Sequence, residues 1–420
     1  MHRRAIARVV ATRMREAPVV RITGARAVGK TTTALAEIES RGGSTVSLDD
    51  PDVRAAVAAD PTGYLAALAR PVLVDEYQRV PATLDVIKTD LEERGSEPGS
   101  WLLTGSVSLD TAAHAAGSLG GQLADVTMGT LTLDERNDRA EPRLLSRLLD
   151  EGVGFLRGRR SEVPPDRRDL LAEATRGGFP LVTDRKGAQA RSRRLEDWVN
   201  ASVIADGAAV GGVRNVEGFL RMLRLYAAAT ASIMPKDRLT ADRLEVDRRT
   251  VARYRGLLAG LHVTWDLPAL VPGNATGQVT KSAKLHLVDS GLVAALAGRD
   301  RARTLERDPA FAQSLVETTV VNDLRVQASV LDAPARLFHF READQGVDLV
   351  VERSDGGLLG IEVSLRANPG ARALAGLRRL RRSSGDRWVG GVVLCRVPAG
   401  RLEDEDLAVA PIDVVWSVCD

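Results

Sequence analysis

The chain is poor in cysteine and in long apolar runs, and these two shortages exclude several classes of protein. Its 420 residues contain only two cysteines, Cys395 and Cys419, which are too few for a disulfide framework or a thiolate metal site. No apolar run approaches the length of a membrane span, and the first residues lack the apolar core of a signal peptide. We therefore expect a cytoplasmic protein with no membrane partner.

Aromatic residues and net charge are also low, and both limit how the chain can bind nucleic acid. Aromatic side chains make up 4% of the residues, so the bases of a single strand have few rings on which to stack. The formal net charge is only +2 despite 58 lysines and arginines, so contact with duplex phosphates must come from local patches. The apolar fraction of 44% suffices for packed cores, and the length predicts two to four domains.

Residues 24–31 have the glycine and lysine spacing of a phosphate-binding loop. They follow an apolar run at 19–22 and precede a helix-like segment at 31–38, which is the strand, loop and helix order that this motif requires. Two glycines let successive N–H groups point into one concavity, and the helix that follows adds the positive end of its dipole. We expect Lys30 to reach the β- and γ-phosphates of ATP and Thr31 to ligate Mg²⁺. The expected nucleotide-binding residues are Gly24, Ala25, Arg26, Ala27, Val28, Gly29, Lys30, Thr31, Thr32 and Thr104.

A second predicted strand ends in two carboxylates. Residues 71–76 read as a short buried strand that ends at Asp75 and Glu76. At the carboxyl edge of a parallel sheet, Asp75 would hold Mg²⁺ together with Thr31, and Glu76 would orient and deprotonate the attacking water. The alternative is a strand that ends in a solvated acidic turn. The phosphate loop upstream favours the catalytic interpretation.

Two further strands are predicted around these motifs. Residues 44–48 lie between the two motifs in the chain, a feature that suits the ATPase branch of phosphate-loop proteins. Residues 101–104 lead into Gly-Ser, and Thr104 or Ser106 at this strand end is a candidate sensor of the γ-phosphate or of the water. A strand that ends in Thr-Gly-Ser is also ordinary turn chemistry.

The ordered series of these motifs resembles prokaryotic AAA-type ATPases that carry a C-terminal domain of unknown function 4143. Besides the phosphate loop, the matching segments are residues 48–51, 74–81, 102–106, 130–135, 177–180 and 284–292. The resemblance implies an ATP-binding core, a helical connector, a winged-helix module and a C-terminal region like restriction endonucleases. One departure concerns the Leu-x-Gly-Arg segment of the relatives, because Gln122 occupies its arginine position here. Hydrolysis is then expected to be slow or to need an arginine from another subunit.

The middle of the chain is predicted to be helical and basic. Residues 141–215 form the expected connector, and its helices are interrupted by loops at 164–165, 177–178 and 211–212. A helix at 216–230 precedes two shorter helices at 239–244 and 248–258, and strands at 262–267 and 284–288 can pair as a wing. The second short helix carries four arginines near its amino end, where a recognition helix meets DNA. These are Arg248, Arg249, Arg253 and Arg255, and DNA contact and structural packing both remain open for them.

The C-terminal region carries an incomplete endonuclease-like pattern. Such sites use an upstream acid, an acid on one strand and Glu-x-Lys on the next to hold Mg²⁺ and activate water, and the acids correspond to Glu317, Asp348 and Glu362. Ser364 stands at the lysine position, and no lysine follows Lys284, so a migrated lysine within this domain is excluded. We expect a retained fold with lost chemistry. A basic run at 378–382 and strands at 389–396 and 414–418 complete the chain.

Together these patterns predict an α/β protein with a parallel phosphate-loop core. The expected domains are an ATPase domain at 1–130, a helical lid at 131–215, a winged helix at 216–298 and an inactive endonuclease-like α/β domain at 299–420. ATP and Mg²⁺ are the expected cofactors, and slow hydrolysis would control C-terminal modules that bind duplex DNA or protein. The alternatives are a DNA-binding regulator that holds ATP as a structural ligand and a Mg²⁺-dependent nuclease. A homo-oligomer is also compatible with the pattern.

Overall fold

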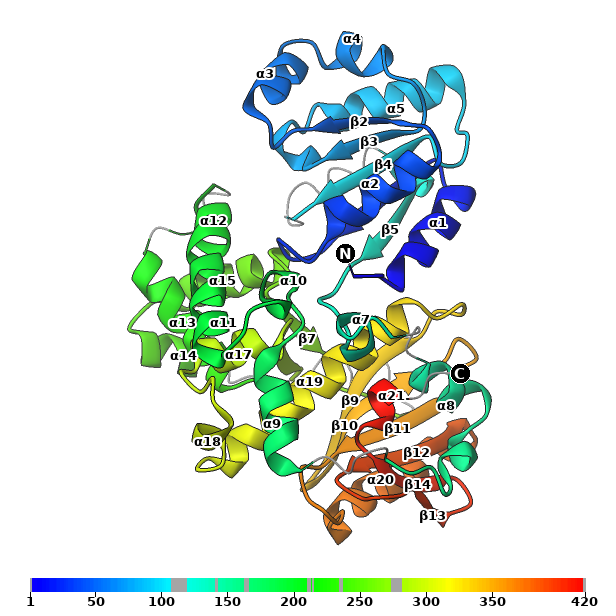
Figure 1. Ribbon diagram of the computed structural model, residues 1–420, viewed down its shortest axis with the longest axis vertical. Coiled ribbons are helices and arrows are strands. Elements are labelled where there is room, and N and C mark those ends of the chain that lie inside the picture. Colours follow the sequence, from blue (N-terminus) through cyan, green and yellow to red (C-terminus); the bar gives the residue numbers. More distant parts are fainter. Residues whose placement is uncertain are drawn as a thin grey trace.

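The computed structural model describes residues 2–106, 119–139, 143–161, 166–209, 213, 215–233, 237–272 and 282–417. The loop residues predicted at 164–165 and 211–212 lie outside the described residues, and so does Val418. Figure 1 shows an N-terminal part with its own sheet, a group of helices beside it, and a C-terminal part built on a second sheet. Among the described residues, no helix combines the length and the apolar character that a membrane crossing requires.

The N-terminal sheet is parallel, as predicted, and its strand order places the two motifs close together. The order is β2-β3-β4-β1-β5, so β4 lies between the strand before the phosphate loop and the strand that ends in carboxylates. The strand predicted at 44–48 is β2. It lies at the edge of the sheet beside β3, so β4 is the strand that separates the two motifs in space. The strands are β1 (Val19–Thr23), β2 (Ser44–Ser47), β3 (Val72–Asp75), β4 (Trp101–Gly105) and β5 (Leu123–Thr127).

Helices cover both faces of this sheet, because apolar side chains point alternately to either side of each strand. Val20 and Ile22 of β1 pack in the core that includes α1 and α2, whereas Val19 packs in the core of α3, α4 and α5. Asp50 begins α3 by accepting the N–H groups of residues 52 and 53, with proline at the first helical position. The elements are α1 (Ile6–Glu16), α2 (Lys30–Ser40), α3 (Pro51–Ala59), α4 (Pro61–Ala66), η1 (Tyr77–Arg79), α5 (Thr83–Arg94) and η2 (Gly120–Gln122).

The middle of the chain contains the predicted helices and a small antiparallel sheet in the order β6-β8-β7, which we call the small sheet. Asp247 begins α15 by accepting the backbone N–H of Thr250. The helices are α7 (Leu133–Arg136), α9 (Arg167–Arg176), α10 (Pro180–Thr183), α11 (Ala188–Trp198), η4 (Val199–Ile204), α12 (Ala205–Ala209), α13 (Val216–Ala228), α14 (Asp237–Leu244), α15 (Arg248–Gly260), α17 (Ser290–Leu296) and α18 (Ala302–Leu305). The strands are β6 (Ser232–Ile233), β7 (Thr264–Leu267) and β8 (Lys284–Leu287).

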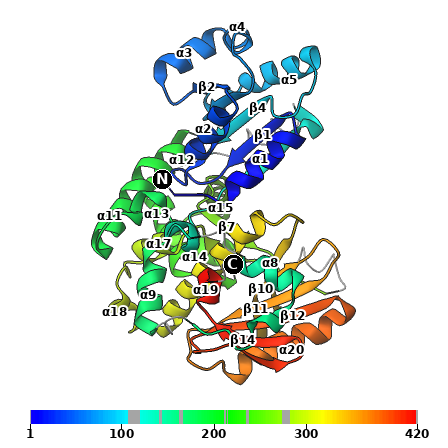
Figure 2. The same ribbon diagram turned by 45° about the vertical axis from the view of Figure 1, so that its right-hand side comes forward.

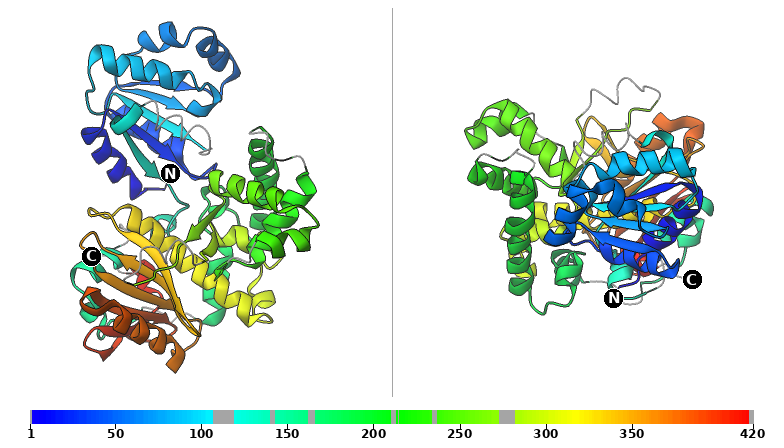
Figure 3. Two further views of the ribbon diagram at one scale, coloured as in Figure 1. Left: turned by 180° about the vertical axis from the view of Figure 1, so that it is seen from behind. Right: turned by 90° about the horizontal axis from the view of Figure 1, so that it is seen from above.

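The C-terminal domain, residues 309–417, is a mixed sheet in the order β13-β14-β12-β11-β10-β9 with helices against it. Seen from behind in Figure 3, the long helix α19 runs between this sheet and the helices of the middle region. The elements are α19 (Pro309–Ser329), β9 (Arg336–Glu342), β10 (Gln345–Glu352), β11 (Leu358–Val363), α20 (Ala371–Ser384), η5 (Gly385–Arg387), β12 (Trp388–Cys395), β13 (Arg401–Asp404), β14 (Leu407–Pro411) and α21 (Val414–Ser417).

Two segments differ from the sequence prediction. The strand predicted at 414–418 is wrong, because α21 forms there and buries Val414 and Val415. The segment containing α8 (Leu144–Asp150) and η3 (Val153–Leu156) was expected in the connector, yet it packs on the C-terminal domain (Figures 1 and 2). Backbone hydrogen bonds join the segment to the same domain; for example, Gly158 N donates to Gly400 O at 2.9 Å. The apolar face of α8 needs a partner, and α19 supplies it.

Candidate functional site

The phosphate loop lies between β1 and α2 and requires glycine at its two ends. Gly24 has a φ of +145°, and a Cβ there would lie 2.3 Å from the carbonyl oxygen of Met128. Gly29 has a φ of +105° in the left-handed region and forms the N-cap of α2. Between them, Ala25 and Val28 are buried and anchor the loop in the core. The loop thus has a fixed backbone at the amino end of a helix, which is suited to hold phosphate oxygens.

Lys30 is buried at the start of α2, and its ammonium caps the loop. Its Nζ donates to the carbonyl oxygens of Gly24 at 2.9 Å and Ala25 at 3.0 Å. Burial lowers the pKa of Lys30 to about 8, although the nearby carboxylates Glu76 and Asp75 oppose that shift. Within the described part of the chain, this ammonium donates its hydrogen bonds to neutral carbonyl oxygens. A phosphate group would therefore be a stronger partner for it.

The lowered pKa of Lys30 predicts that ATP affinity falls as the pH rises through 8. When the pH exceeds the Lys30 pKa of about 8, most of the nucleotide-free protein has lost the ammonium proton. Only the protonated lysine offers a cation to the phosphates. Between pH 7 and pH 9 the apparent Kd is expected to rise roughly tenfold, since one proton must be regained on binding. Calorimetric titration of ATP at several pH values measures this, and a Kd that is flat over that range would contradict it.

Thr31 and Asp75 meet at the carboxyl edge of the sheet, as the sequence predicted. The Thr31 hydroxyl donates to Asp75 Oδ1 at 2.8 Å, and the Thr104 hydroxyl of β4 donates to the same oxygen. A hydroxyl and a carboxylate beside a phosphate loop are the hard oxygen ligands that Mg²⁺ prefers. The donor set therefore fits Mg²⁺. Thr104 is fully buried and positions Asp75, so its contact supports that carboxylate and does not reach outward.

Glu76 follows Asp75 in an unusual backbone conformation and is held by two polar side chains. Its φ of +55° lies in the left-handed region, which a glutamate adopts only when the surroundings enforce it. Glu76 Oε2 accepts hydrogen bonds from Gln78 and from the Ser106 hydroxyl, the latter at 3.2 Å. Gln78 was not predicted as a site residue, although it lies in the segment 74–81 that resembles AAA-type ATPases. A carboxylate fixed in this way beside Asp75 is placed to act as a general base.

A third set of contacts joins the phosphate loop to the connector, and sequence reasoning missed it. Arg26 lies within the loop, and its guanidinium is 3.2 Å from Asp206 and 3.8 Å from Asp49. The indole of Trp198 donates to the carbonyl oxygen of Arg26 at 3.1 Å. Burial raises the pKa of Asp206, while the nearby Arg26 lowers it. Asp206 and Trp198 lie 180 and 172 residues from Arg26 in the chain, so no local sequence pattern predicts these two contacts.

Gln122 does not lie near the phosphate loop. It ends η2 directly before β5, and β5 is parallel to β1 with Leu123 paired to Val19. The phosphate loop follows the opposite end of β1, so β5 separates Gln122 from it by five residues, about 16 Å of strand. An arginine at this position could not reach the nucleotide of the same chain. Thr32 is exposed at the third residue of α2, next to Thr31.

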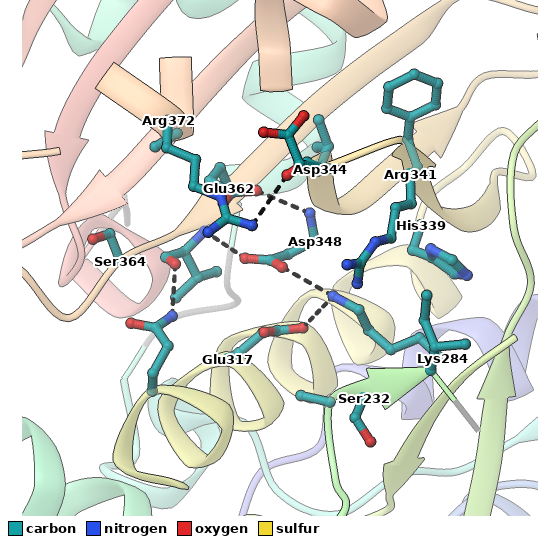
Figure 4. Close-up of a pocket in the computed structure, with 18 of the residues that line it drawn as sticks. Ser232, Lys284, Glu317, His339, Arg341, Asp344, Asp348, Glu362, Ser364 and Arg372 are labelled. Carbon is teal, nitrogen blue, oxygen red and sulfur yellow. Dashed lines mark hydrogen bonds and ion pairs between the residues drawn. The ribbon is translucent and has the colours of Figure 1, made fainter. Parts of the chain in front are cut away.

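The remaining candidate residues form two groups. Arg248, Arg249 and Arg253 are exposed on α15, whereas Arg255 donates to Asp266 at 2.7 Å. In the C-terminal domain, Glu317, Asp348 and Glu362 converge on a cavity of about 450 Å³, and Ser364 also lines it (Figure 4). The sequence assigned Lys284 to a wing strand only, yet its ammonium also enters this cluster.

Three known protein domains match parts of the chain. An AAA domain matches residues 16–137, the domain of unknown function DUF8612 matches residues 167–303, and the domain of unknown function DUF4143 matches residues 312–413. Uncharacterized proteins of Mycobacterium tuberculosis and Mycobacterium bovis are each 28% identical to the chain over 357 residues, which are 85% of this chain and 72% of each relative.

Solved structures with lower identity were also found. A Walker-type ATPase of Pyrococcus abyssi is 12% identical, with a TM-score of 0.39, and the match covers 69% of this chain and 94% of that one. The RuvB Holliday junction branch migration motor of Thermotoga maritima is 15% identical, with a TM-score of 0.29, over 63% of this chain and 89% of that one. The chain therefore contains an AAA domain that carries the phosphate-binding loop and a C-terminal DUF4143 domain, and in this it resembles AAA-type P-loop ATPases.

Proposed function

We propose that this protein hydrolyses ATP to ADP and phosphate in a Mg²⁺-dependent reaction. The observation that carries the proposal is the convergence of Lys30, Thr31, Asp75 and Glu76 at one edge of the parallel sheet, with the first and the last two of them buried. Lys30 would hold the β- and γ-phosphates, and Thr31 and Asp75 would hold Mg²⁺. The bound ion would neutralise charge on the phosphate oxygens.

In this reaction Glu76 acts as the general base. A water beside the γ-phosphate gives a proton to the Glu76 carboxylate, its oxygen bonds to phosphorus, and the bond to the β-phosphate oxygen breaks. Ser106 and Gln78 keep the carboxylate oriented by their hydrogen bonds. Gln122 lies before β5, at the end of the sheet opposite to the phosphate loop, so a residue at this position could act only on the nucleotide of another subunit. Because glutamine carries no positive charge, turnover would be slow unless another arginine reaches the site. A homo-oligomer remains part of the proposal for that reason.

Arg26 is the proposed link between the nucleotide and the rest of the chain. It sits in the loop that would surround the phosphates, and it lies 3.2 Å from Asp206 of α12. A triphosphate carries more negative charge than one aspartate, so nucleotide would compete with Asp206 for the guanidinium. Release of Asp206 would free the end of the helical segment that Trp198 also ties to the loop. ATP occupancy would thereby change the position of the connector.

The Asp206→Asn variant tests this link. The change removes the charge that holds Arg26 and keeps the shape, so connector helices η4 and α12 are expected to behave without ATP as they do with it in the wild type. Hydrogen–deuterium exchange of these helices, with and without ATP and Mg²⁺, measures the difference. The Asp197→Asn variant is the matched control, since Asp197 is exposed on α11. A nucleotide response in Asp206→Asn equal to that of the wild type would contradict the link.

Duplex DNA is the proposed partner of the middle region. The exposed arginines at the start of α15, Arg248, Arg249 and Arg253, offer an electrostatic contact to phosphates. The C-terminal basic segment supports such contact less, because Arg379 pairs with Glu342 and Arg381 pairs with Asp406 at 3.0 Å. A DNA-binding regulator that holds ATP as a structural ligand is the second candidate function. It shares these contacts and differs in lacking turnover.

A further inference from the structure

The carboxylates of the C-terminal domain surround an ammonium group from another part of the chain. Lys284 of β8 donates to Glu317 Oε1 of α19 at 2.6 Å and to Asp348 Oδ1 of β10 at 2.9 Å. The side chains of Lys284, Glu317 and Asp348 are exposed by 12%, 8% and 16% respectively. Figure 4 shows this ammonium between the two carboxylates. The contact joins the small sheet to the C-terminal domain.

These residues do not fit the divalent metal ion that an endonuclease-like fold implies. Asp348 Oδ1 binds Lys284, and its Oδ2 accepts the backbone N–H of Val363 at 3.1 Å. Glu362 Oε2 accepts the backbone N–H of Asp348, also at 3.1 Å. Ser364 stands where a lysine would be needed. Within the described part of the chain, no cluster of three or more His, Cys, Asp or Glu side chains is arranged to hold a metal.

We propose that this cluster is an interdomain clamp, in which the ammonium of Lys284 occupies the place of a metal ion and ties the small sheet to the C-terminal domain. The nuclease alternative is thereby disfavoured. The proposal is independent of whether the protein hydrolyses ATP.

The charges in the cluster are consistent with a clamp. Burial acts against a charge on Lys284, but Asp348 and Glu317 outweigh it and raise the pKa of the lysine, so the ammonium stays charged at all physiological pH values. Burial and the neighbouring Asp348 raise the pKa of Glu317, while the Lys284 ammonium opposes that shift and favours the charged carboxylate. Removal of Lys284 would take away the ammonium that Glu317 and Asp348 both contact, which is costly for buried carboxylates.

Backbone contacts strengthen the same junction. Leu270 N donates to the carbonyl oxygen of His339 at 2.7 Å, and His339 N donates to Pro268 O at 2.8 Å, so the chain after β7 pairs with β9. Asn322 of α19 also donates to Leu287 O of β8 at 2.8 Å. The small sheet is therefore attached to the C-terminal domain by strand pairing, by α19 and by the Lys284 ammonium. These parts would move as one body when ATP shifts the connector.

Binding of Mn²⁺ to the nucleotide-free protein tests the clamp and is measured by electron paramagnetic resonance. The proteins compared are wild type, Lys284→Met, Asp348→Asn and the double variant. Wild type and Asp348→Asn are expected to bind equal amounts of Mn²⁺, because Lys284 fills the site. Lys284→Met is expected to gain Mn²⁺ binding that the double variant loses. The Lys186→Met variant is the control, since Lys186 is exposed.

Hydrogen–deuterium exchange of the same proteins adds a readout that does not involve metal. In Lys284→Met, amides of β8 and of residues 268–270 are expected to exchange roughly tenfold faster than in wild type, because the buried pair is broken. The comparison of wild type with Asp348→Asn remains decisive if Lys284→Met does not fold. Wild-type Mn²⁺ binding that Asp348→Asn abolishes would overturn the clamp, and so would cleavage of duplex DNA by wild type with Mg²⁺.

Discussion

The Lys30→Ala variant is expected to bind ATP roughly a hundredfold more weakly than wild type. Hydrogen bonds to a charged group contribute up to about 3 kcal/mol each, and a factor of ten corresponds to about 1.4 kcal/mol. Lys30 is the buried cation of the loop, and its ammonium is surrounded by carbonyl oxygens that a phosphate would replace as partners. Alanine leaves the loop backbone intact but removes the charge. The Kd for ATP, measured by calorimetry at pH 7, checks this expectation.

The control for this variant is Lys88→Ala, because Lys88 is exposed on α5 and belongs to neither motif. It is expected to bind ATP as wild type does. Equal affinities for Lys30→Ala and wild type would show that the loop does not carry the nucleotide. The thermal unfolding midpoint of each variant separates lost binding from lost folding.

The Glu76→Gln variant is expected to keep ATP affinity within about threefold of wild type and to lose turnover by roughly a hundredfold or more. A general base contributes about 10² to 10⁴ in rate, and glutamine cannot accept the proton. The size and the hydrogen-bonding capacity toward Ser106 are kept, so the change acts on chemistry and leaves the site in place. Phosphate release under saturating ATP and Mg²⁺ measures the loss.

Glu92→Gln on the exposed side of α5 serves as the matched control and should turn over ATP normally. If Glu76→Gln hydrolysed ATP at the wild-type rate, Glu76 would not be the base, and its strained backbone would need another explanation. A fall in ATP affinity that equals the fall in turnover would instead point to a binding role.

The sequence predicted the local parts of this site well, because they depend on short-range geometry. The loop from Gly24 to Gly29 and the pair Asp75 and Glu76 are each set by one strand end and the turn that follows. Parallel pairing then brings the two strand ends to one sheet edge without further information. The resemblance to AAA-type proteins with a C-terminal domain 4143 is confirmed by the family matches.

The long-range contacts could not be predicted, because they depend on how separate parts dock. Arg26 and Asp206 are 180 residues apart, and Lys284 and Asp348 are 64 apart. The sequence excluded a lysine from within the C-terminal domain at the endonuclease-like cluster, but it could not show that Lys284 of the small sheet contacts that cluster. The short apolar run at 414–417 fits a strand or a helix equally in sequence, and packing against α19 decides for the helix.

The most direct test of the central claim is ATP hydrolysis by the purified wild-type protein with Mg²⁺, with and without duplex DNA at low salt. Slow phosphate release is expected, and it should stop when Mg²⁺ is chelated and change when duplex DNA is added. Tight ATP binding without any Mg²⁺-dependent phosphate release would contradict this expectation, and ATP would then be a structural ligand.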